Sequence, residues 1–551
     1  MKKRFLISLF SIAIVGLTFT GCSSGPSDYK RSRGTGRPMT GKEGGYKFTP
    51  KYQNQITAPG LVFIEGGTFT FGEVEDDVMN DWNNTPNQQH VRSFYMDETE
   101  VTNLMYLEYL DWLKKVFPTD EESYKNIYKG ALPDTMVWRT PLGYNEDLVN
   151  NYLRHPAYAL YPVVGVNWIQ AVQYCNWRTD RVNEYLLFKT GKLNKEALLH
   201  PNADELFSTE TYLTSPELAF GGNTDMYNRG KKRRKNDTLL NVVNRSSGII
   251  LPSYRLPSEV EWEYAAKSDI GLREYNTLKG RKIYPWKGYS TRILKKGKNQ
   301  GKELANFKID DGNYDGLAGW SDDAADITAP VKSYPPNDFG LYDMAGNVNE
   351  WVADVYRQII DDEANDFNYY RGNIYTKQAF NEDGELVVIT PDSIPMDTLP
   401  NGKIIVSQLP GSPGKVKVDD NELYLRQNFD RADNRDYRDG DVESSRNYIK
   451  DKEEIAEDPN LRMYNAPKHE VYADSTTLVK NYDKSDNRTT LVDNEVRVIK
   501  GGSWRDRAYW LNPAQRRFYP QYLSRNDIGF RCAMSRVGNK SIKKSFRRPV
   551  N

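Results

Sequence analysis

The stretch NDFGLYDMAGNVNEW, residues 337–351, decides the fold because its turn-forming residues lead directly into an apolar run. Asn, Asp and Gly recur through it, and each of them favours a turn for its own conformational reason. The apolar run continues as WVADVY, which is long enough for a short strand or a short helix. We therefore predict a turn-rich loop that ends in a short regular element.

Segments before this loop predict short strands and one capped helix. In GLVFIEGGTFTFG, residues 60–72, apolar residues lie on both sides of a Gly-Gly pair, which predicts two strands joined by a tight hairpin. SFYMDETEVTN, residues 93–103, predicts a further strand. Thr102 is suited to cap the helix that the apolar spacing of residues 104–117 predicts.

Three more segments carry clear local signals. VVGVNWIQAVQYCNWRTDR, residues 163–181, predicts a strand, a turn and a helix. In RLPSEVEWEYAA, Pro257 marks a helix start that Ser258 and Glu261 would cap as a partial capping box. Near the C-terminus, VRVIKGGSW and IGFRCAMSR predict two strands around an aromatic, arginine-rich loop.

The composition favours a loop-rich domain with aromatic surfaces. Only 38% of the residues are hydrophobic, whereas the chain contains 37 Tyr and 11 Trp. Few aliphatic and many aromatic residues do not suit a helical bundle. The 75 basic and 75 acidic residues balance, so the charge gives no reason to expect nucleic acid as a partner.

The N-terminus carries an export signal. Residues 1–22, MKKRFLISLFSIAIVGLTFTGC, have a basic start, an apolar run too short to span a membrane, and then Thr-Gly-Cys. This pattern predicts a lipoprotein signal peptide over residues 1–21, whose cleavage leaves Cys22 as an acylated N-terminus. An ordinary secretory signal is the alternative. Residues 22–57 are rich in Ser, Gly, Lys and Arg and predict a flexible basic tether that spans roughly 30 Å.

Two further cysteines follow Cys22, namely Cys175 and Cys532. Export places both in an oxidising compartment, where a pair of cysteines can form a disulfide. The enclosed loop is very long, so the chain-entropy model puts the stabilisation at roughly 5 kcal/mol. Two buried free thiols are the alternative.

Seven motifs, taken in order, resemble one known family. They are GLVFIEGGTFTFG, SFYMDETEVTN, PVVGVNW with AVQYCNW, YRLPSEVEWEYAA, NDFGLYDMAGNVNEW, KGGSW and IGFRCA. Together they span residues 58–536 and are similar to the formylglycine-generating-enzyme domain family, also called the sulfatase-modifying-factor family. The resemblance implies an α+β fold that is an irregular variant of the C-type-lectin-like architecture, low in secondary structure, with short strands and a few helices.

The same resemblance implies where catalysis would take place. Enzymes of this family bind copper through two cysteines after the GGS motif, because thiolates select soft Cu(I). Asp506 and Leu511 occupy the matching positions here, and neither supplies a thiolate. A related branch uses iron held by a histidine cluster, but the four histidines of this chain lack ligand-like spacing. We therefore expect no copper, no iron and no enzymatic activity. A new site at Asp506 is the alternative to a salt-bridged loop.

The resemblance further implies two structural calcium sites. At each site, two side chains and two backbone carbonyls would supply the hard oxygen ligands that suit Ca²⁺. The first set is Asp343, Glu350 and the carbonyls of Gly346 and Val348, and the second set is Asn306, Asp323 and the carbonyls of Phe307 and Ala325. Loops held by Asx turns without metal are the alternative for both sites. The resemblance also pairs Cys175 with Cys532.

Two long segments depart from the family pattern. They are insertions over about residues 181–252, which include the basic run RGKKRRK, and about residues 358–494. Insertions of this size usually lie on the surface and carry specialised contacts. Residues 537–551 form a basic tail that would suit docking to a partner, and a frayed terminus is the alternative.

The export signal and a family domain without cysteines at the copper-binding positions, taken together, resemble the gliding-motility and type IX secretion lipoproteins of Bacteroidota. This resemblance implies a scaffold on the outer membrane that contacts other subunits of the machinery, including a related lipoprotein. No acidic run follows Cys22, which favours the periplasmic face. Two alternatives are a diverged oxidase and a lectin-like module that binds a glycan or peptide at a concave aromatic site near Trp504 and Trp510.

Overall fold

The computed structural model describes residues 31–39, 55–228, 242–269, 282–309, 325–356, 375–419, 469–482 and 495–538, with short gaps inside these ranges of which 73–82 is the longest. The chain divides into two compact units. The smaller unit contains residues 1–55, 246–248 and 540–551, and in its described part Arg31 forms an isolated bridge with Pro38. The larger unit, residues 56–245 and 249–539, contains both four-stranded sheets.

Both sheets of the larger unit join strands that are far apart in the sequence. The first sheet has the order β1 (Leu61–Ile64), β4 (Phe94–Asp97), β16 (Ala533–Ser535) and β5 (Tyr254–Arg255), with every pair antiparallel. The second sheet has the order β14 (Arg517–Pro520), β13 (Val496–Lys500), β6 (Asn349–Val355) and β15 (Ile528–Gly529). Only β15 and β6 run parallel in the second sheet.

The remaining strands form four two-stranded ribbons. The pairs are β2 (Gly67–Phe71) with β3 (Asn87–Val91), β7 (Thr376–Gln378) with β10 (Lys415–Lys417), β8 (Met396–Thr398) with β9 (Ile404–Val406), and β11 (His469–Asp474) with β12 (Thr477–Tyr482). The last three pairs all belong to the second predicted insertion.

The helices are mostly short. They are α2 (Asn103–Val116), α3 (Lys125–Ala131), α4 (Glu146–Asn151), α5 (Trp168–Lys189), α6 (Glu196–Leu199), α7 (Thr209–Thr214) and α8 (Glu259–Lys267). Single 3-10 turns connect them at η2 (Thr135–Trp138), η3 (Pro156–Tyr158), η4 (Ala219–Gly222), η5 (Thr224–Met226), η6 (Arg245–Ser247), η8 (Pro391–Ser393) and η13 (Ala508–Leu511). This mixture of helices and strands confirms the predicted α+β class. Among the described residues, no helix has the length and apolarity needed to cross a bilayer.

The predicted helix starts are confirmed where side chains cap the backbone. Thr102 accepts a hydrogen bond from the backbone N–H of Met105 at the start of α2. Ser258 and Glu261 form a complete capping box at the start of α8. Because a cap satisfies backbone donors that no helical carbonyl can reach, these signals act locally and are visible in the sequence.

Two predictions about strands are wrong. The Gly-Gly pair in residues 60–72 does not join a hairpin: β1 pairs with β4, whereas β2 pairs with β3. Residues 163–166 form no strand before α5. The helix α5 continues through residue 181 to Lys189 and buries Leu187 completely.

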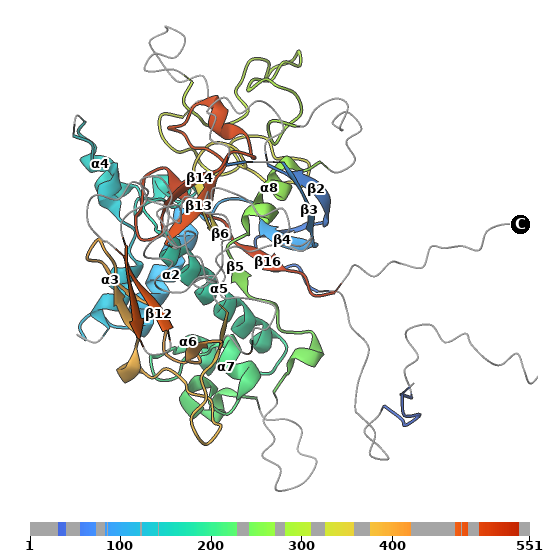
Figure 1. The fold of residues 1–551 in the computed structure, drawn as a ribbon, viewed down its shortest axis with the longest axis vertical. Coiled ribbons are helices and arrows are strands. Elements are labelled where there is room, and N and C mark those ends of the chain that lie inside the picture. Colours follow the sequence, from blue (N-terminus) through green and yellow to red (C-terminus); the bar gives the residue numbers. More distant parts are fainter. Residues whose placement is uncertain are drawn as a thin grey trace, which may run out of the picture. The chain divides into compact units, whose positions relative to one another are not determined.

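The main core surrounds α5, which crosses the larger unit beside α2 and β5 (Figure 1). Its aromatic centre contains Tyr106, Tyr109, Tyr174 and Trp177, whose ring centroids lie 5.1 to 5.9 Å apart. Phe530, just before β16, packs edge-on against Tyr174. Aromatic rings supply much apolar area per residue, so this core compensates for the low aliphatic content.

Several predicted features lie outside the described residues. They are the signal peptide over 1–21, the acylation site Cys22, most of the tether over 22–57, the basic run 229–235, Asp323, much of 358–494, and the tail beyond Gly538.

Candidate functional site

The loop of residues 343–350, here called the carboxylate loop, has an unusual backbone. Asp343, Gly346 and Asn347 all have positive φ, at 56°, 79° and 60°. A Cβ on Gly346 would lie 2.3 Å from the carbonyl oxygen of Asn306, so only glycine fits there. Such conformations persist where the surroundings over-determine them, and they cluster at functional sites.

Glu350 at the end of this loop is completely buried and ion-paired. Arg531, also completely buried, donates two hydrogen bonds of 2.6 Å to the two carboxylate oxygens of Glu350. The indole N–H of Trp262 donates a third, at 2.7 Å, to Oε2. This geometry is the bidentate arrangement that a buried guanidinium and carboxylate require to offset their desolvation.

Two further buried carboxylates lie near this pair, and one of them, Glu100, was not predicted. Burial, then the negative charges of Asp343 and Glu350, raise the pKa of Glu100 well above its usual range. Burial also raises the pKa of Asp343 to about 6. Among the described residues, Oε1 of Glu100 and Oδ1 of Asp343 have no hydrogen-bond partner. One guanidinium therefore faces three carboxylates, and two of their oxygens lack a partner.

These orphaned oxygens fit the predicted calcium site. A buried acceptor without a donor is costly, and a cation bound by Asp343 and neighbouring carbonyls would remove that cost. The predicted ligands Asp343, Gly346, Val348 and Glu350 belong to this one loop. Within the described part of the chain, no group of three or more His, Cys, Asp or Glu side chains is arranged to hold a metal. The ion would therefore depend on backbone carbonyls as well as on Asp343, because Arg531 already binds both carboxylate oxygens of Glu350, and its presence stays a prediction.

The second predicted calcium set is only partly described. Asn306 and Phe307 lie against the carboxylate loop, where Asn347 donates its backbone N–H to the Asn306 carbonyl at 2.8 Å. The side-chain amide of Asn306 donates to the carbonyl of Ile327 at 2.8 Å. Ala325 is described and Asp323 is not, so this site also stays a prediction.

Cys175 on α5 and Cys532 next to β16 meet in the main core. Their Sγ atoms lie 3.3 Å apart, and both residues are buried free thiols in the structure. The pairing of these positions thus agrees with the resemblance, and the covalent bond between them stays a prediction.

The segment 501–511, here called the GGS loop, is the place where relatives would carry their copper ligands. Arg517 donates two hydrogen bonds of 2.7 Å to the carboxylate of Asp506. Ser503 and Asn349 donate to the same carboxylate at 2.6 and 3.1 Å. Burial would raise the pKa of Asp506, but the hydrogen bonds and charge of Arg517 outweigh it and hold the pKa below its usual range.

Leu511 fills the second of the two positions with hydrocarbon. Its side chain is completely buried and packs with Ala305, Phe307 and Ala345 in a small apolar cluster. Asp506 is thus a fully engaged anion and Leu511 a core residue. Neither arrangement offers a metal ligand of the thiolate type, a general base near neutral pH or a nucleophile.

Trp504 and Trp510 do not frame an open aromatic site. Trp504 stacks on Trp138 with ring centroids 6.1 Å apart, and its indole N–H donates to the carbonyl of Asn526. The guanidinium of Arg517 lies 4.4 Å from the ring centre of Trp510. Both rings therefore serve the packing of the GGS loop.

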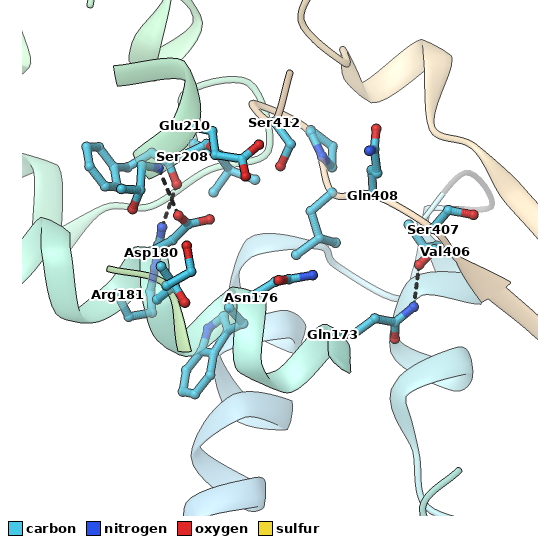
Figure 2. Close-up of a pocket in the computed structure, with 18 of the residues that line it drawn as sticks. Gln173, Asn176, Asp180, Arg181, Ser208, Glu210, Val406, Ser407, Gln408 and Ser412 are labelled. Carbon is cyan, nitrogen blue, oxygen red and sulfur yellow. Dashed lines mark hydrogen bonds between the residues drawn. The ribbon is translucent and has the colours of Figure 1, made fainter. Parts of the chain in front are cut away.

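A pocket of about 260 Å³ lies elsewhere, between α5 and the two insertions (Figure 2). One stripe of α5 forms its floor through Gln173, Asn176, Asp180 and Arg181, spaced as neighbours on a helix surface. Figure 2 shows the amide of Asn176 pointing into the space below residues 407–412.

Side chains of α5 hold both walls of this pocket. Arg181 donates to the carbonyl of Phe207 at 2.8 Å, and Asp180 accepts from the backbone N–H of Thr209 at 2.8 Å. Gln173 donates to the carbonyl of Val406 on the opposite wall. The insertions also contact each other, since Thr211 donates to the carbonyl of Gly411 at 2.6 Å. The pocket is thus an ordered product of both insertions.

Comparison with known proteins gives a consistent picture. The model of the sulfatase-modifying factor enzyme 1-like domain matches residues 47–386, more than half of the chain. The formylglycine-generating enzyme of Mus musculus is 22% identical over 392 residues, covering 64% of this chain and 77% of that protein. The inactive C-alpha-formylglycine-generating enzyme 2 of Bos taurus is 39% identical over 104 residues, covering 19% of this chain and 27% of that protein. Among solved structures, PvdO from Pseudomonas aeruginosa aligns over 88% of this chain and 100% of its own at 15% identity, with a TM-score of 0.37.

Proposed function

The chain belongs to the sulfatase-modifying factor enzyme 1-like domain family, and we propose that it is a non-catalytic member that acts as a lipid-anchored scaffold. The observation that carries this proposal is the GGS loop. There, Asp506 is held by Arg517, Ser503 and Asn349, and Leu511 is buried. The family includes both formylglycine-generating enzymes and a relative named as inactive, so non-catalytic members have a precedent.

The scaffold would stand on the outer membrane and face the periplasm. Support comes from the signal pattern over residues 1–21 and from Cys22, which would carry the acyl chains. The basic tether over residues 22–57 would set the distance from the bilayer. Calcium in the carboxylate loop and a Cys175–Cys532 bond would stiffen a loop-rich domain of the C-type-lectin-like kind.

The machinery we propose is that of gliding motility and type IX secretion in Bacteroidota. Residues 74–113, the chain length and the long second insertion resemble the gliding lipoprotein GldJ more than the related lipoprotein GldK, which would be a neighbouring subunit. Such a role needs specific protein contacts and no chemistry at the GGS loop.

The pocket over α5 supports a binding role. Its walls come from the two insertions that depart from the family pattern, and its lining combines Trp and Arg residues, which dominate the energetics of protein interfaces. Two buried donors on its lining, Nε1 of Trp177 and Nε of Arg181, have no hydrogen-bond partner among the described residues. A partner segment with carbonyl or carboxylate acceptors would satisfy them.

Metal analysis together with oxygen uptake tests the non-catalytic assignment. Mature protein, purified without chelator, is expected to contain calcium and to consume no oxygen with thiol substrates. Stoichiometric copper or iron, with turnover that Asp506→Ala abolishes, would overturn the assignment.

Crosslinking with mass spectrometry in native membranes tests the scaffold role. We expect crosslinks from lysines near the pocket, such as Lys415, to other envelope proteins. Asn176→Trp would fill the pocket from its exposed floor and should remove those crosslinks. Lys295→Gln, in an exposed loop away from the pocket lining, is the matched control and should leave them unchanged. An unaltered crosslink pattern in Asn176→Trp would count against the pocket as the docking point.

A further inference from the structure

Both ends of the larger unit meet at one edge of the first sheet. The hydroxyl of Tyr254 in β5 donates to the carbonyl of Pro59, close to where the chain enters the unit, at 3.1 Å. The same strand pairs with β16, and Arg255 donates to the hydroxyl of Ser535 at 3.0 Å, just before the chain leaves the unit. Figure 1 shows β5 and β16 side by side at this edge.

A cavity of about 480 Å³ opens at this edge, and it has an amphipathic lining. Its inner wall is apolar, with Phe94 and Leu256 buried and Trp168 partly buried. Arg92 and Ser535 are exposed and belong to its outer part. An apolar floor beneath a polar rim suits a ligand that itself has an apolar and a polar part.

The charge at the rim is positive. Three arginines line the cavity, namely Arg92, Arg255 and Arg536, whereas Glu261 is the carboxylate that lines it. Arg255 forms an ion pair with Glu261 and donates hydrogen bonds of 2.6 and 2.7 Å to its two carboxylate oxygens. Nε of Arg536 has no hydrogen-bond partner among the described residues, and its guanidinium lies 4.7 Å from the ring centre of Phe63. Among the described residues that line the cavity, the arginines thus outnumber the carboxylate by three to one.

We propose that this arginine-rimmed cavity docks the folded unit on an anionic phospholipid bilayer. Arg92 and Arg536 would bind lipid phosphates, as guanidinium groups do, while the apolar floor accepts the upper part of a lipid chain. The proposal rests on the proposed lipid anchor, since the tether to Cys22 starts at the same edge as the cavity. It goes beyond that anchor because it assigns the orientation of the folded unit and the residues that set it.

The sequences that flank the two ends reinforce this assignment. The tether carries basic residues, and the segment after Gly538 contains Lys540, Lys543, Lys544, Arg547 and Arg548. Clusters of Lys and Arg next to a membrane are attracted to anionic lipids over about one Debye length. A tether also keeps the domain at high effective concentration near the surface, so even weak attraction would orient it.

Vesicle sedimentation tests the proposal with the mature chain beginning at Ser23, which lacks only the acylation site. We expect binding to vesicles that contain phosphatidylglycerol, no binding to phosphatidylcholine alone, and loss of binding at high salt. The double variant Arg92→Gln/Arg536→Gln should lower the partition coefficient roughly 30-fold, since each basic residue at an anionic surface contributes about fivefold. Lys295→Gln/Lys296→Gln removes the same charge from an exposed loop and should leave binding unchanged.

Three results would overturn the proposal. The first is equal partition of wild type and the arginine double variant, with both showing the same thermal unfolding midpoint. The second is complete loss of binding in a chain that ends at Gly538, with no effect of the arginine changes, because the tail alone would then act. The third is that the wild-type cavity binds inorganic phosphate but not vesicles. Phosphate binding would be followed by ³¹P NMR and would be lost in the double variant. Each of these results leaves the non-catalytic assignment intact, because that assignment depends on Asp506 and Leu511.

Discussion

One conservative substitution in the carboxylate loop is predicted to change the free energy of unfolding in opposite directions with and without calcium. Asp343→Asn keeps the size of the side chain and an oxygen for the backbone N–H of Lys332, which donates to Asp343 Oδ2 at 3.0 Å. Asparagine also tolerates the left-handed backbone at this position, where φ is 56°. The change therefore removes the charge of Asp343 and little else.

The magnitude follows from the pKa of Asp343. Burial raises this pKa to about 6 in the folded chain, whereas an unfolded aspartate titrates near 3.9. A raised folded pKa means that the group's stabilisation is fully present below about pH 4 and is lost as the pH rises through about 6. At pH 7 the charged carboxylate then costs the calcium-free protein about 3 kcal/mol.

The assay is urea unfolding at pH 7 and pH 5, with EDTA or with calcium. In EDTA at pH 7, Asp343→Asn is expected to be more stable than wild type by up to about 3 kcal/mol, and this gain should shrink at pH 5. With calcium, wild type should gain stability by mass action and overtake the variant, which has lost a carboxylate ligand. A variant that is less stable than wild type in EDTA at pH 7 would refute the reasoning.

Asp506→Asn is the matched control, because it makes the same chemical change at a carboxylate with a partner. The pKa of Asp506 is lowered, so its stabilisation is present above the unfolded pKa and is lost as the pH falls through the folded pKa. Removing its charge leaves Arg517 without an anion and should cost about 2 kcal/mol at pH 7. This loss should not depend on calcium, and a calcium-dependent loss would contradict the separation of the two sites.

Three other changes test the packing and electrostatics around these sites by the same unfolding assay. Leu511→Ala should destabilise the protein by about 2 to 5 kcal/mol, since Leu511 is fully buried, and a loss below about 1 kcal/mol would contradict its role in the core. Gly346→Ala should cost more than about 2 kcal/mol, because the added Cβ would meet Asn306 at 2.3 Å, and a neutral effect would exclude the close approach. Burial raises the pKa of Glu184 on α5 to about 7, so Glu184→Gln should remove a stability gain that wild type shows as the pH falls from 8 to 6, and an unchanged pH profile would contradict that burial.

Local chemistry explains which parts of the fold the sequence could predict. Thr102 and the Ser258–Glu261 capping box act within four residues, so their patterns determine helix starts without help from the rest of the chain. The two strands around the Gly-Gly pair of residues 60–72 were also visible as strands. The strands with which they pair could not be predicted. β1 pairs with β4 and β2 pairs with β3, through contacts that no local pattern encodes.

In the candidate site, too, residues that share one local segment could be predicted, whereas residues brought together by the fold could not. Asp343 and Glu350 could be singled out because they share one loop with Gly346. Glu100 could not, since it is far from the loop in the sequence and meets it in space, where the side-chain amide of Asn347 donates to Oε2 of Glu100 at 3.0 Å. The one local sign was an acidic residue directly before the apolar Val101, in a segment predicted to form a strand. A salt-bridged loop at Asp506 was considered from the sequence, but its partner is Arg517 on β14 and neither of the adjacent arginines.

The substitutions in the GGS loop also change what that loop contributes to the fold. Through Asp506 and its partners Asn349 and Arg517, the loop ties β6 to β14 within the second sheet. Through Leu511 it packs on Phe307, beside the carboxylate loop. A redox site needs an open coordination position, whereas Asp506 is held by four hydrogen bonds and Leu511 is completely buried. Reinstating cysteines at both positions would therefore remove an ion pair and a core side chain together. In the proposed non-catalytic scaffold, the same side chains would both stabilise the loop and leave it without thiolate ligands.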